Sequence, residues 1–254
     1  MLGNGLIGYT GFVGSTLNKV GRFERRYNSR NIDDIRGQRF NRLVCAGATA
    51  AKWIANQNPE DDLASIQRLT SALEQVEAHE FILVSTVDVF SDPIGVLEDT
   101  PILENPQAYG RNRFILEQGV QRIFPHAQII RLPGLFGHGL KKNILFDLIH
   151  NNNVEAISME TTFQWYPVAR LPADLDIFIS TRLPLLHIAP QPLATGALVS
   201  RYFADDASRL LGRATISYDM RTNHPSLFGS PLGHYHFSAV QTVDAIGEFL
   251  EAFR

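Results

Sequence analysis

Three glycines near the N-terminus have a spacing that could bind phosphate. Gly8, Gly11 and Gly14 read G-x-x-G-x-x-G between a predicted strand at residues 2–7 and a predicted helix at residues 13–20. In that context one glycine makes a tight turn, one lets the backbone approach a pyrophosphate, and one allows close packing of helix on strand. Amide groups and the dipole at the helix start attract the phosphates. We therefore predict dinucleotide binding; the alternative is an ordinary turn with a helix cap.

The segment after the second predicted strand indicates which dinucleotide is bound. It reads Asn28-Ser29-Arg30-Asn31, and no carboxylate follows until Asp33. NAD sites usually place a carboxylate here on the ribose hydroxyls, whereas a 2′-phosphate favours an arginine. Ser29 and Arg30 therefore favour NADP over NAD, the alternative being a solvated turn with an incidental arginine.

The phosphate loop and three later segments resemble the extended short-chain dehydrogenase/reductase family. Residues 8–14 (GYTGFVG) are similar to the family loop T-G-x-x-G-F-x-G, except that Ile7 replaces the first threonine. Residues 81–90 (FILVSTVDVF) resemble the S-T-D-Y-V-F segment of dTDP-4-dehydrorhamnose reductases. Residues 109–113 (YGRNR) stand at the Y-x-x-x-K position, and residues 129–137 (IIRLPGLFG) resemble the segment beside the nicotinamide. The match is good to about residue 145 and loose beyond it.

This resemblance implies a catalytic set of Thr86, Tyr109 and Arg113. Hydride transfer to or from a carbinol also needs a proton partner, and a phenol can serve if nearby positive charge lowers its pKa from about 10. Four residues along a helix places the cation of Arg113 on the tyrosine's face. Arginine can bond a ribose hydroxyl but cannot give up its proton as the family lysine does. Either Tyr109 works with a modified relay, or activity is reduced or lost.

Two further points bear on this set. Asp62 stands where the family often has a relay asparagine, although a helix start explains Asp62 equally well. The alternative for the pair itself is that Tyr109 is an ordinary helix-cap aromatic and Arg113 a solvated charge.

The remaining predicted site residues divide into two groups. For the substrate we expect Asp88, Asn143, Arg170 and Arg221, because arginines outside the cofactor loop suit the diphosphate of a nucleotide sugar; the alternative is plain surface charge. Cys45 is expected to be a buried structural cysteine near the cofactor. The predicted cofactor contacts are Gly8, Thr10, Gly11, Phe12, Val13, Gly14, Ser29, Arg30, Cys45, Ala46, Gly47, Ser85, Tyr109, Arg113, Leu132, Pro133 and Gly134.

The predicted elements alternate between strand and helix, which is typical of a parallel sheet with helices on both faces. A helix should begin at Pro59 behind an Asn58 cap, and another at Ser238, which has Gln241 at capping-box spacing. The fold class is α/β, a Rossmann-type doubly wound parallel sheet at residues 1–145. Residues 146–254 should form a smaller substrate-binding lobe interleaved with the main sheet. The other predicted strands are 23–28, 42–46, 81–85, 128–132, 154–158, 163–168 and 185–189, and the other predicted helix is 108–121.

Composition limits the classes of partner. The chain of 254 residues has a net charge of -3, so we expect no nucleic acid and no membrane partner. Eight histidines show no metal-ligand spacing, so no metal is predicted. One cysteine and no signal peptide at the N-terminus suggest a cytoplasmic protein. The resemblance suggests a homodimer through helices carrying residues 63–76 and 114–120, whose apolar faces could equally pack on the sheet.

Two functions follow from these observations. The first is an NADP-dependent oxidoreductase or epimerase-type enzyme for a nucleotide-linked sugar or similar carbonyl metabolite. NADP favours reduction, while epimerisation and dehydration would use the same tyrosine. The second is an NADP-binding regulatory or accessory subunit with lost or reduced catalysis. Arg113 and the short C-terminal part support this alternative.

Overall fold

The computed structural model describes residues 2–213, 217–229 and 232–252, which form two compact units. The first unit contains residues 2–92, 99–132 and 170–187. The second contains 93–98, 133–169 and the described residues from 188 onward. Among the described residues, no helix is long and apolar enough to cross a membrane.

A six-stranded parallel sheet forms the centre of the first unit, as predicted. Its order is β10-β6-β4-β3-β1-β2. Ile7 at the end of β1 pairs with Tyr27 and Cys45, so three strands finish level, while β4 continues from Leu83 to Thr86. The strands are β1 (Gly5–Ile7), β2 (Arg25–Tyr27), β3 (Arg39–Cys45), β4 (Glu77–Thr86), β6 (Gln128–Leu132) and β10 (Leu185–His187).

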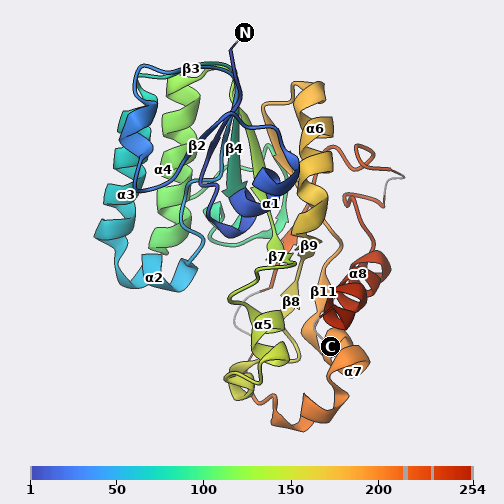
Figure 1. Ribbon diagram of the computed structural model, residues 1–254. Coiled ribbons are helices and arrows are strands. Elements are labelled where there is room, and N and C mark those ends of the chain that lie inside the picture. The colour runs from blue at the N-terminus through green and yellow to red at the C-terminus, as the bar shows by residue number, and fades with distance from the viewer. Residues whose placement is uncertain (1, 214–216, 230–231, 253–254) are drawn as a thin grey trace. The chain divides into compact units, whose positions relative to one another are not determined.

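Helices cover both faces of this sheet (Figure 1). Helices α1 (Phe12–Val20) and α6 (Leu171–Thr181) pack together on one face, and α3 (Pro59–Leu73) and α4 (Ala108–Ile123) on the other. The start of α3 at Pro59 is confirmed. The short helix α2 (Lys52–Gln57), which the sequence patterns did not predict, precedes it.

The inner faces of α3 and α4 are packed on the sheet. Ile66, Leu69, Leu73, Leu116 and Val120 all lie in the buried core between helices and strands. The regularly spaced apolar residues of both helices therefore pack against the sheet of the same chain.

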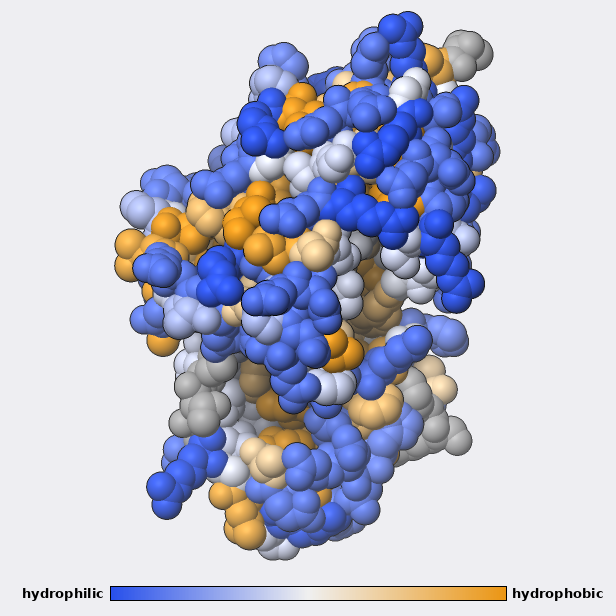
Figure 2. Space-filling view, turned by 90° about the vertical axis from the view of Figure 1, so that its left-hand side faces the viewer, coloured by the Kyte–Doolittle hydropathy of each residue, from blue (hydrophilic) through white to orange (hydrophobic). Residues whose placement is uncertain are grey.

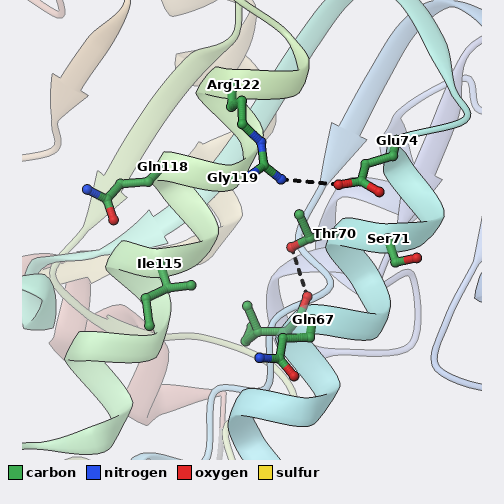
Figure 3. A pocket seen from close by; sticks show the side chains of 9 residues that line it. Gln67, Thr70, Ser71, Glu74, Ile115, Gln118, Gly119 and Arg122 are labelled. Atoms are coloured by element: carbon green, nitrogen blue, oxygen red, sulfur yellow. Dashed lines mark hydrogen bonds and ion pairs between the residues drawn. The ribbon is translucent and has the colours of Figure 1, made fainter.

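The outer faces of α3 and α4 border a groove lined by residues of both helices (Figure 3). Arg122 on α4 and Glu74 on α3 form an ion pair across it, at 3.1 Å. Figure 2, which views the molecule from the α3 side, shows a mostly hydrophilic surface with separate hydrophobic groups. A homodimer through these helices stays a prediction. The groove is lined by Ile66, Gln67, Thr70, Ser71, Glu74, Ile115, Gln118, Gly119 and Arg122.

The described residues of the second unit form short strand pairs and the helices α5, α7 and α8. Strand pairs β7–β9 and β5–β12 are parallel, and β8–β11 is antiparallel. Its elements are β5 (Ile94–Val96), β7 (Gly134–Phe136), α5 (Ile144–Ile149), β8 (Thr162–Phe163), β9 (Trp165–Pro167), β11 (Leu193–Ala194), α7 (Thr195–Tyr202), β12 (Asp219–Met220) and α8 (Ala239–Glu251).

The structure corrects the boundary predicted at residue 145. Residues 133–145 belong to the second unit, because β7 pairs with β9 there. The chain then returns to the first unit for residues 170–187, and β10 joins the main sheet beside β6. The prediction that the second unit binds substrate stays a prediction.

Two strands predicted in the second unit differ from the structure. Residues 154–158 are not a strand: Asn153 adopts a left-handed conformation (φ 49°), and a 3-10 turn at Val154–Ala156 follows. The strand predicted at 163–168 is interrupted at Gln164. Its buried amide donates to the carbonyls of Pro190 and Met220, at 2.6 and 2.7 Å.

The predicted capping box at the start of α8 is present and gives a stability test. Ser238 Oγ accepts from the Gln241 amide at 3.0 Å, and Gln241 Oε1 accepts from the Ser238 amide at 2.8 Å. Ser238→Ala should lower the free energy of unfolding by about 1 kcal/mol in urea denaturation. Ser200→Ala, at an exposed position inside α7, is the matched control and should be close to neutral. Equal effects of the two substitutions would contradict the cap.

Candidate functional site

The loop between β1 and α1 can be formed only with glycine at two of its positions. Gly8 has φ +85°, donates its amide to the Tyr27 carbonyl at 2.7 Å, and accepts from the Gly11 amide at 2.9 Å. A Cβ on Gly8 would overlap the carbonyl of Ala46, and one on Gly14 would overlap the carbonyl of Gly8. The backbone is thus folded tightly between the ends of β1 and β3.

The start of α1 is suited to an anion. Gly11 is the N-cap, and it has no side chain that could accept from the amides of the first turn. The first turn of α1, at residues 12–15, contains no acidic residue. The positive end of the helix dipole is therefore not neutralised by the helix itself. The predicted contacts Thr10, Phe12 and Val13 lie in this loop and first turn, and Gly47 follows β3 beside Ile7.

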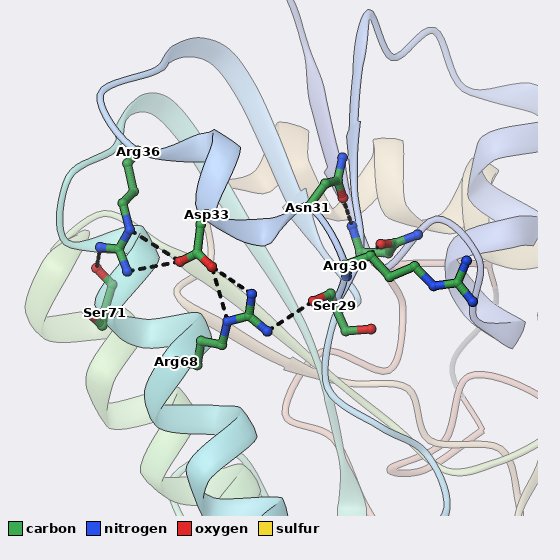
Figure 4. A network of polar contacts seen from close by, with 8 residues as sticks. Ser29, Arg30, Asn31, Asp33, Arg36, Arg68 and Ser71 are labelled. Carbon is green, nitrogen blue, oxygen red and sulfur yellow. Dashed lines mark hydrogen bonds and ion pairs between the residues drawn. The ribbon is translucent and has the colours of Figure 1, made fainter.

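After β2, one carboxylate, that of Asp33, is bound by two arginines (Figure 4). Asp33 is bound by Arg68 at 2.6 Å and by Arg36 at 3.1 Å, and these hydrogen bonds lower the pKa of its carboxyl. Arg68 also donates to the carbonyl of Ser29 at 3.1 Å. Arg30 is exposed and extends away from this pair. Sequence reasoning missed Arg68, because it comes from α3 and no local pattern links it to the turn.

Thr86 and Tyr109 lie together at the carboxyl end of β4. The Thr86 hydroxyl donates to Asp88 Oδ2 at 3.4 Å and accepts from the Asp88 amide at 3.2 Å, and Gly110, next to Tyr109, packs on the Asp88 carbonyl. Tyr109 is buried in the first turn of α4, where its amide donates to Asn56 Oδ1 at 2.9 Å. The structure therefore brings the two predicted residues to the same end of β4.

The phenol of Tyr109 holds its proton firmly. Burial raises its pKa to about 12, and the carboxylate of Asp88 acts in the same direction. The charge of Arg113 and the hydrogen bond from Thr86 oppose this rise without cancelling it. From the sequence we expected a neighbouring cation to lower the pKa of Tyr109. In the structure, burial and Asp88 raise this pKa by more than Arg113 lowers it.

Arg113 is a buried ion-pair partner and not a solvated charge. Its Nη1 and Nη2 bind the two carboxylate oxygens of Asp62 at 2.8 and 2.9 Å, and Nη2 donates to the Thr49 carbonyl at 2.5 Å. The guanidinium lies over the ring of Tyr109, 4.5 Å from its centroid. Asn112 donates a further bond to Asp62 at 2.9 Å. Among the described residues, Arg113 Nε is buried with no hydrogen-bond partner.

Ser85 belongs to a second buried network that sequence reasoning did not predict. Its hydroxyl donates to Glu117 at 2.5 Å, and Arg131 binds the same carboxylate at 2.6 and 3.0 Å. Arg131 also lies 3.2 Å from His187 Nε2. Because a guanidinium only donates, His187 Nε2 must accept, which places the imidazole proton on Nδ1.

Most of the predicted substrate residues have local partners. Asn143 caps α5 by accepting from the Phe146 amide at 3.0 Å. Arg170 lies 3.4 Å from Asp174, and Arg221 lies 2.7 Å from Asp219. Only Asp88 is in contact with the Thr86–Tyr109 pair, and the substrate role of all four residues stays a prediction.

The other predicted cofactor residues occupy the ends of β3 and β6. Cys45 is fully buried, and burial raises the pKa of its thiol to about 11, so the thiol stays protonated. Leu132 ends β6 opposite Thr86. Pro133 and Gly134 belong to the second unit, where Gly134 pairs with Trp165.

The Arg113–Asp62 pair should be strongly coupled. Asp62→Asn leaves a buried cation without its counter-charge and should lower the free energy of unfolding by about 3 kcal/mol in urea denaturation. The double variant Asp62→Asn with Arg113→Met should cost less than the sum of the single variants. Asp61→Asn, at the exposed neighbouring position, is the control and should cost under about 1 kcal/mol. Additive single effects would contradict a buried ion pair.

Comparisons with known proteins identify the fold. No family model and no curated protein matches the chain. Among solved structures, the NAD-dependent NDP-hexosamine 5,6-dehydratase TunA has a TM-score of 0.72 at 16% identity, covering 98% of each chain. A dTDP-4-dehydrorhamnose reductase from Clostridium acetobutylicum has a TM-score of 0.69 at 14% identity, covering 98% of this chain and 99% of that one. RMD from Pseudomonas aeruginosa, complexed with NADPH, has a TM-score of 0.72 at 14% identity, covering 99% and 100%. The chain therefore has the fold of the extended short-chain dehydrogenase/reductase family, as its sequence resemblance predicted.

Proposed function

We propose that the chain is an NADP(H)-dependent reductase of a nucleotide-linked sugar or a similar carbonyl metabolite, with Tyr109 as the proton donor. The observation that carries this proposal is the packing of the start of α4, which carries Tyr109, on the turn at the carboxyl end of β4, which carries Thr86 and Asp88. Carboxyl ends of parallel strands are where α/β folds bind their ligands. In this proposal Thr86 orients the substrate oxygen and Tyr109 donates the proton to it.

The glycine loop and the start of α1 fit the pyrophosphate of a dinucleotide. Gly8 and Gly14 leave no room for a side chain, and the first turn of α1 offers uncapped amides. Near Tyr109, the buried Nε of Arg113 lacks a partner among the described residues, and a ribose hydroxyl would supply one. NADPH supplies a hydride when it is bound.

The charges after β2 support NADP over NAD. The carboxylate of Asp33 is held by Arg36 and Arg68, which leaves it poorly placed to accept from ribose hydroxyls. Arg30 adds an exposed guanidinium to the same turn. An exposed arginine on this turn suits a 2′-phosphate.

The proton of Tyr109 supports reduction over reactions that begin with oxidation. A phenol with a pKa of about 12 is protonated at neutral pH and can donate, whereas a base must first lose that proton. Epimerases and dehydratases of this fold are among the similar structures, as are reductases. The firmly held proton is the feature that favours the reductase role.

A second candidate function is an NADP-binding accessory subunit. The ion pair between Arg113 and Asp62 favours it, because the cation at the family's lysine position is neutralised by a carboxylate. Cofactor binding is common to both candidates, so turnover distinguishes them.

Cofactor selectivity can be measured by isothermal titration calorimetry. We expect NADPH to bind at least about tenfold more tightly than NADH, a difference of about 1.4 kcal/mol. Arg30→Ala and Arg68→Ala should each reduce this preference, because each removes a guanidinium from the turn. Arg39→Ala, which removes an exposed arginine paired with Glu77, is the control and should leave it unchanged. Gly14→Val should abolish binding of both cofactors. If the unaltered chain binds NADH as tightly as NADPH, or more tightly, the proposal of NADP as the cofactor is wrong.

Catalysis can be tested by following NADPH oxidation with a panel of nucleotide-linked keto-sugars. Tyr109→Phe should reduce kcat by about 100-fold or more while NADPH affinity stays unchanged, because only the proton donor is lost. The rate should not fall as the pH rises through about 10, where an ordinary phenol ionises, since the folded phenol keeps its proton up to about pH 12. Tight NADPH binding without turnover, and without gain in the Asp62→Asn, Arg113→Lys double variant, would instead favour the accessory subunit.

A further inference from the structure

The guanidinium of Arg131 on β6 is connected to both sides of the turn at residues 86–89, which follows β4. Before the turn, it binds the carboxylate of Glu117 at 2.6 and 3.0 Å, and this carboxylate accepts from the Ser85 hydroxyl at 2.5 Å. After the turn, it lies over the ring of Phe90, 5.1 Å from the centroid. One buried side chain therefore links the residues that immediately precede and follow the turn.

The parallel sheet places these groups next to one another. Ser85 pairs with Arg131, and Arg131 pairs with His187, in the register of β4, β6 and β10. Register partners on neighbouring strands point to the same face of a sheet. Glu117 reaches this face from α4, and His187 Nε2 accepts from Arg131 Nη1 at 3.2 Å. The rings of His187 and Phe90 are packed edge to face, with centroids 5.7 Å apart. Three strands and one helix thus contribute to the surroundings of one guanidinium.

Burial fixes the position of this guanidinium. The side chains of Arg131 and Glu117 are 4% and 2% exposed, and His187 and Phe90 are buried beside them. A buried charge has no water to replace a lost partner, so breaking any one of its contacts is costly. Two bonds to Glu117 and one to His187 also fix the plane of the guanidinium. Arg131 is therefore a rigid support for the ring of Phe90.

The same turn contacts the start of α4, which carries Tyr109. The carbonyl of Asp88 accepts from Asn105 Nδ2 at 2.9 Å. Gly110 packs so closely on this carbonyl that a Cβ at Gly110 would overlap it. A shift of the turn would therefore change where the Thr86 hydroxyl lies relative to the start of α4.

We propose that Arg131 is a positioning residue of the proposed active site, because its contacts through Glu117 and with Phe90 hold both ends of the turn that carries Thr86. The catalytic consequence rests on the proposed reductase function, whereas the hold on the turn is a property of the chain alone. An ion pair that only stabilised the core would change global unfolding and leave local opening of the turn unaltered.

The hold on the turn can be tested without cofactor or substrate, by amide hydrogen exchange followed by NMR. The amide of Asp88 donates to Thr86 Oγ1 at 3.2 Å, and the amide of Phe90 donates to the Val87 carbonyl at 3.1 Å. Both amides therefore report opening of the turn. The amides of β3, in the middle of the sheet, report global unfolding.

The main variant is the double substitution Glu117→Gln with Arg131→Met. It removes both charges of the buried pair together, so neither charge is left without its partner. We expect exchange at the two turn amides to become at least about tenfold faster, because the turn opens without breaking the ion pair that held it. Exchange at the wild-type rate in the folded double variant would overturn the proposal.

A matched pair of phenylalanine substitutions covers the case in which the double variant does not fold. Phe90→Leu leaves the ion pair intact and should speed exchange at the Asp88 amide by at least about threefold. Phe124→Leu is the control, because Phe124 is equally buried in the same unit but stacks on Phe81, with centroids 4.2 Å apart. It should speed exchange in β3 and leave the turn amides at the wild-type rate. Equal acceleration of the turn amides by both substitutions would overturn the proposal.

Turnover separates the positioning role from the proposed reductase function. In Phe90→Leu, kcat for NADPH oxidation should fall by at least about fivefold, while NADPH affinity by calorimetry stays unchanged because the glycine loop is unaltered. Unchanged kcat in a variant whose turn opens faster would overturn the positioning role. Faster opening of the turn in a chain whose unaltered form shows no turnover would keep the hold on the turn and overturn only the reductase function.

Discussion

The buried ion pair between Arg113 and Asp62 fixes the site more than any other interaction. It joins α4 to the first turn of α3, and a bond from Arg113 to the Thr49 carbonyl adds the segment after β3. Removing two charges from water costs several kcal/mol for each ion, so such a pair is tolerated only where geometry and further hydrogen bonds compensate. The bidentate contact between Arg113 and Asp62 and the further hydrogen bond from Asn112 meet that condition. Tyr109, one helical turn before Arg113, is placed by the same constraint.

The pair also determines the electrostatics at the phenol. A cation bound at 2.8 Å to a carboxylate acts on a third group mainly as a dipole, and its effect falls off faster than that of a free charge. Burial and the carboxylate of Asp88 then dominate, and the pKa of Tyr109 rises to about 12. The charge of Arg113 lowers the pKa of Tyr109 but does not offset burial and Asp88.

The sequence could predict what depends on local pattern and not what depends on distant partners. The glycine loop, the parallel sheet and the α8 capping box follow from short-range spacing, and all three are present. The Arg113–Asp62 and Arg68–Asp33 pairs join residues 51 and 35 positions apart, and neither partner carries a signal for the other. The strand predicted at 154–158 was wrong because apolar residues at this spacing also suit a 3-10 turn that buries Val154, once Asn153 turns the chain.

The buried face of α4 explains why the two networks can coexist beside one tyrosine. Tyr109, Arg113 and Glu117 follow at intervals of four, so all three lie on one buried stripe of the helix. Arg113 is neutralised by Asp62, and Glu117 by Arg131, so the stripe carries two opposite charges that are each satisfied by a different element. Arg113→Lys alone would replace a bidentate guanidinium with an ammonium group. The ammonium is smaller and would bind the Asp62 carboxylate at one point. Arg113 and Asp62 are therefore matched to each other as one buried pair.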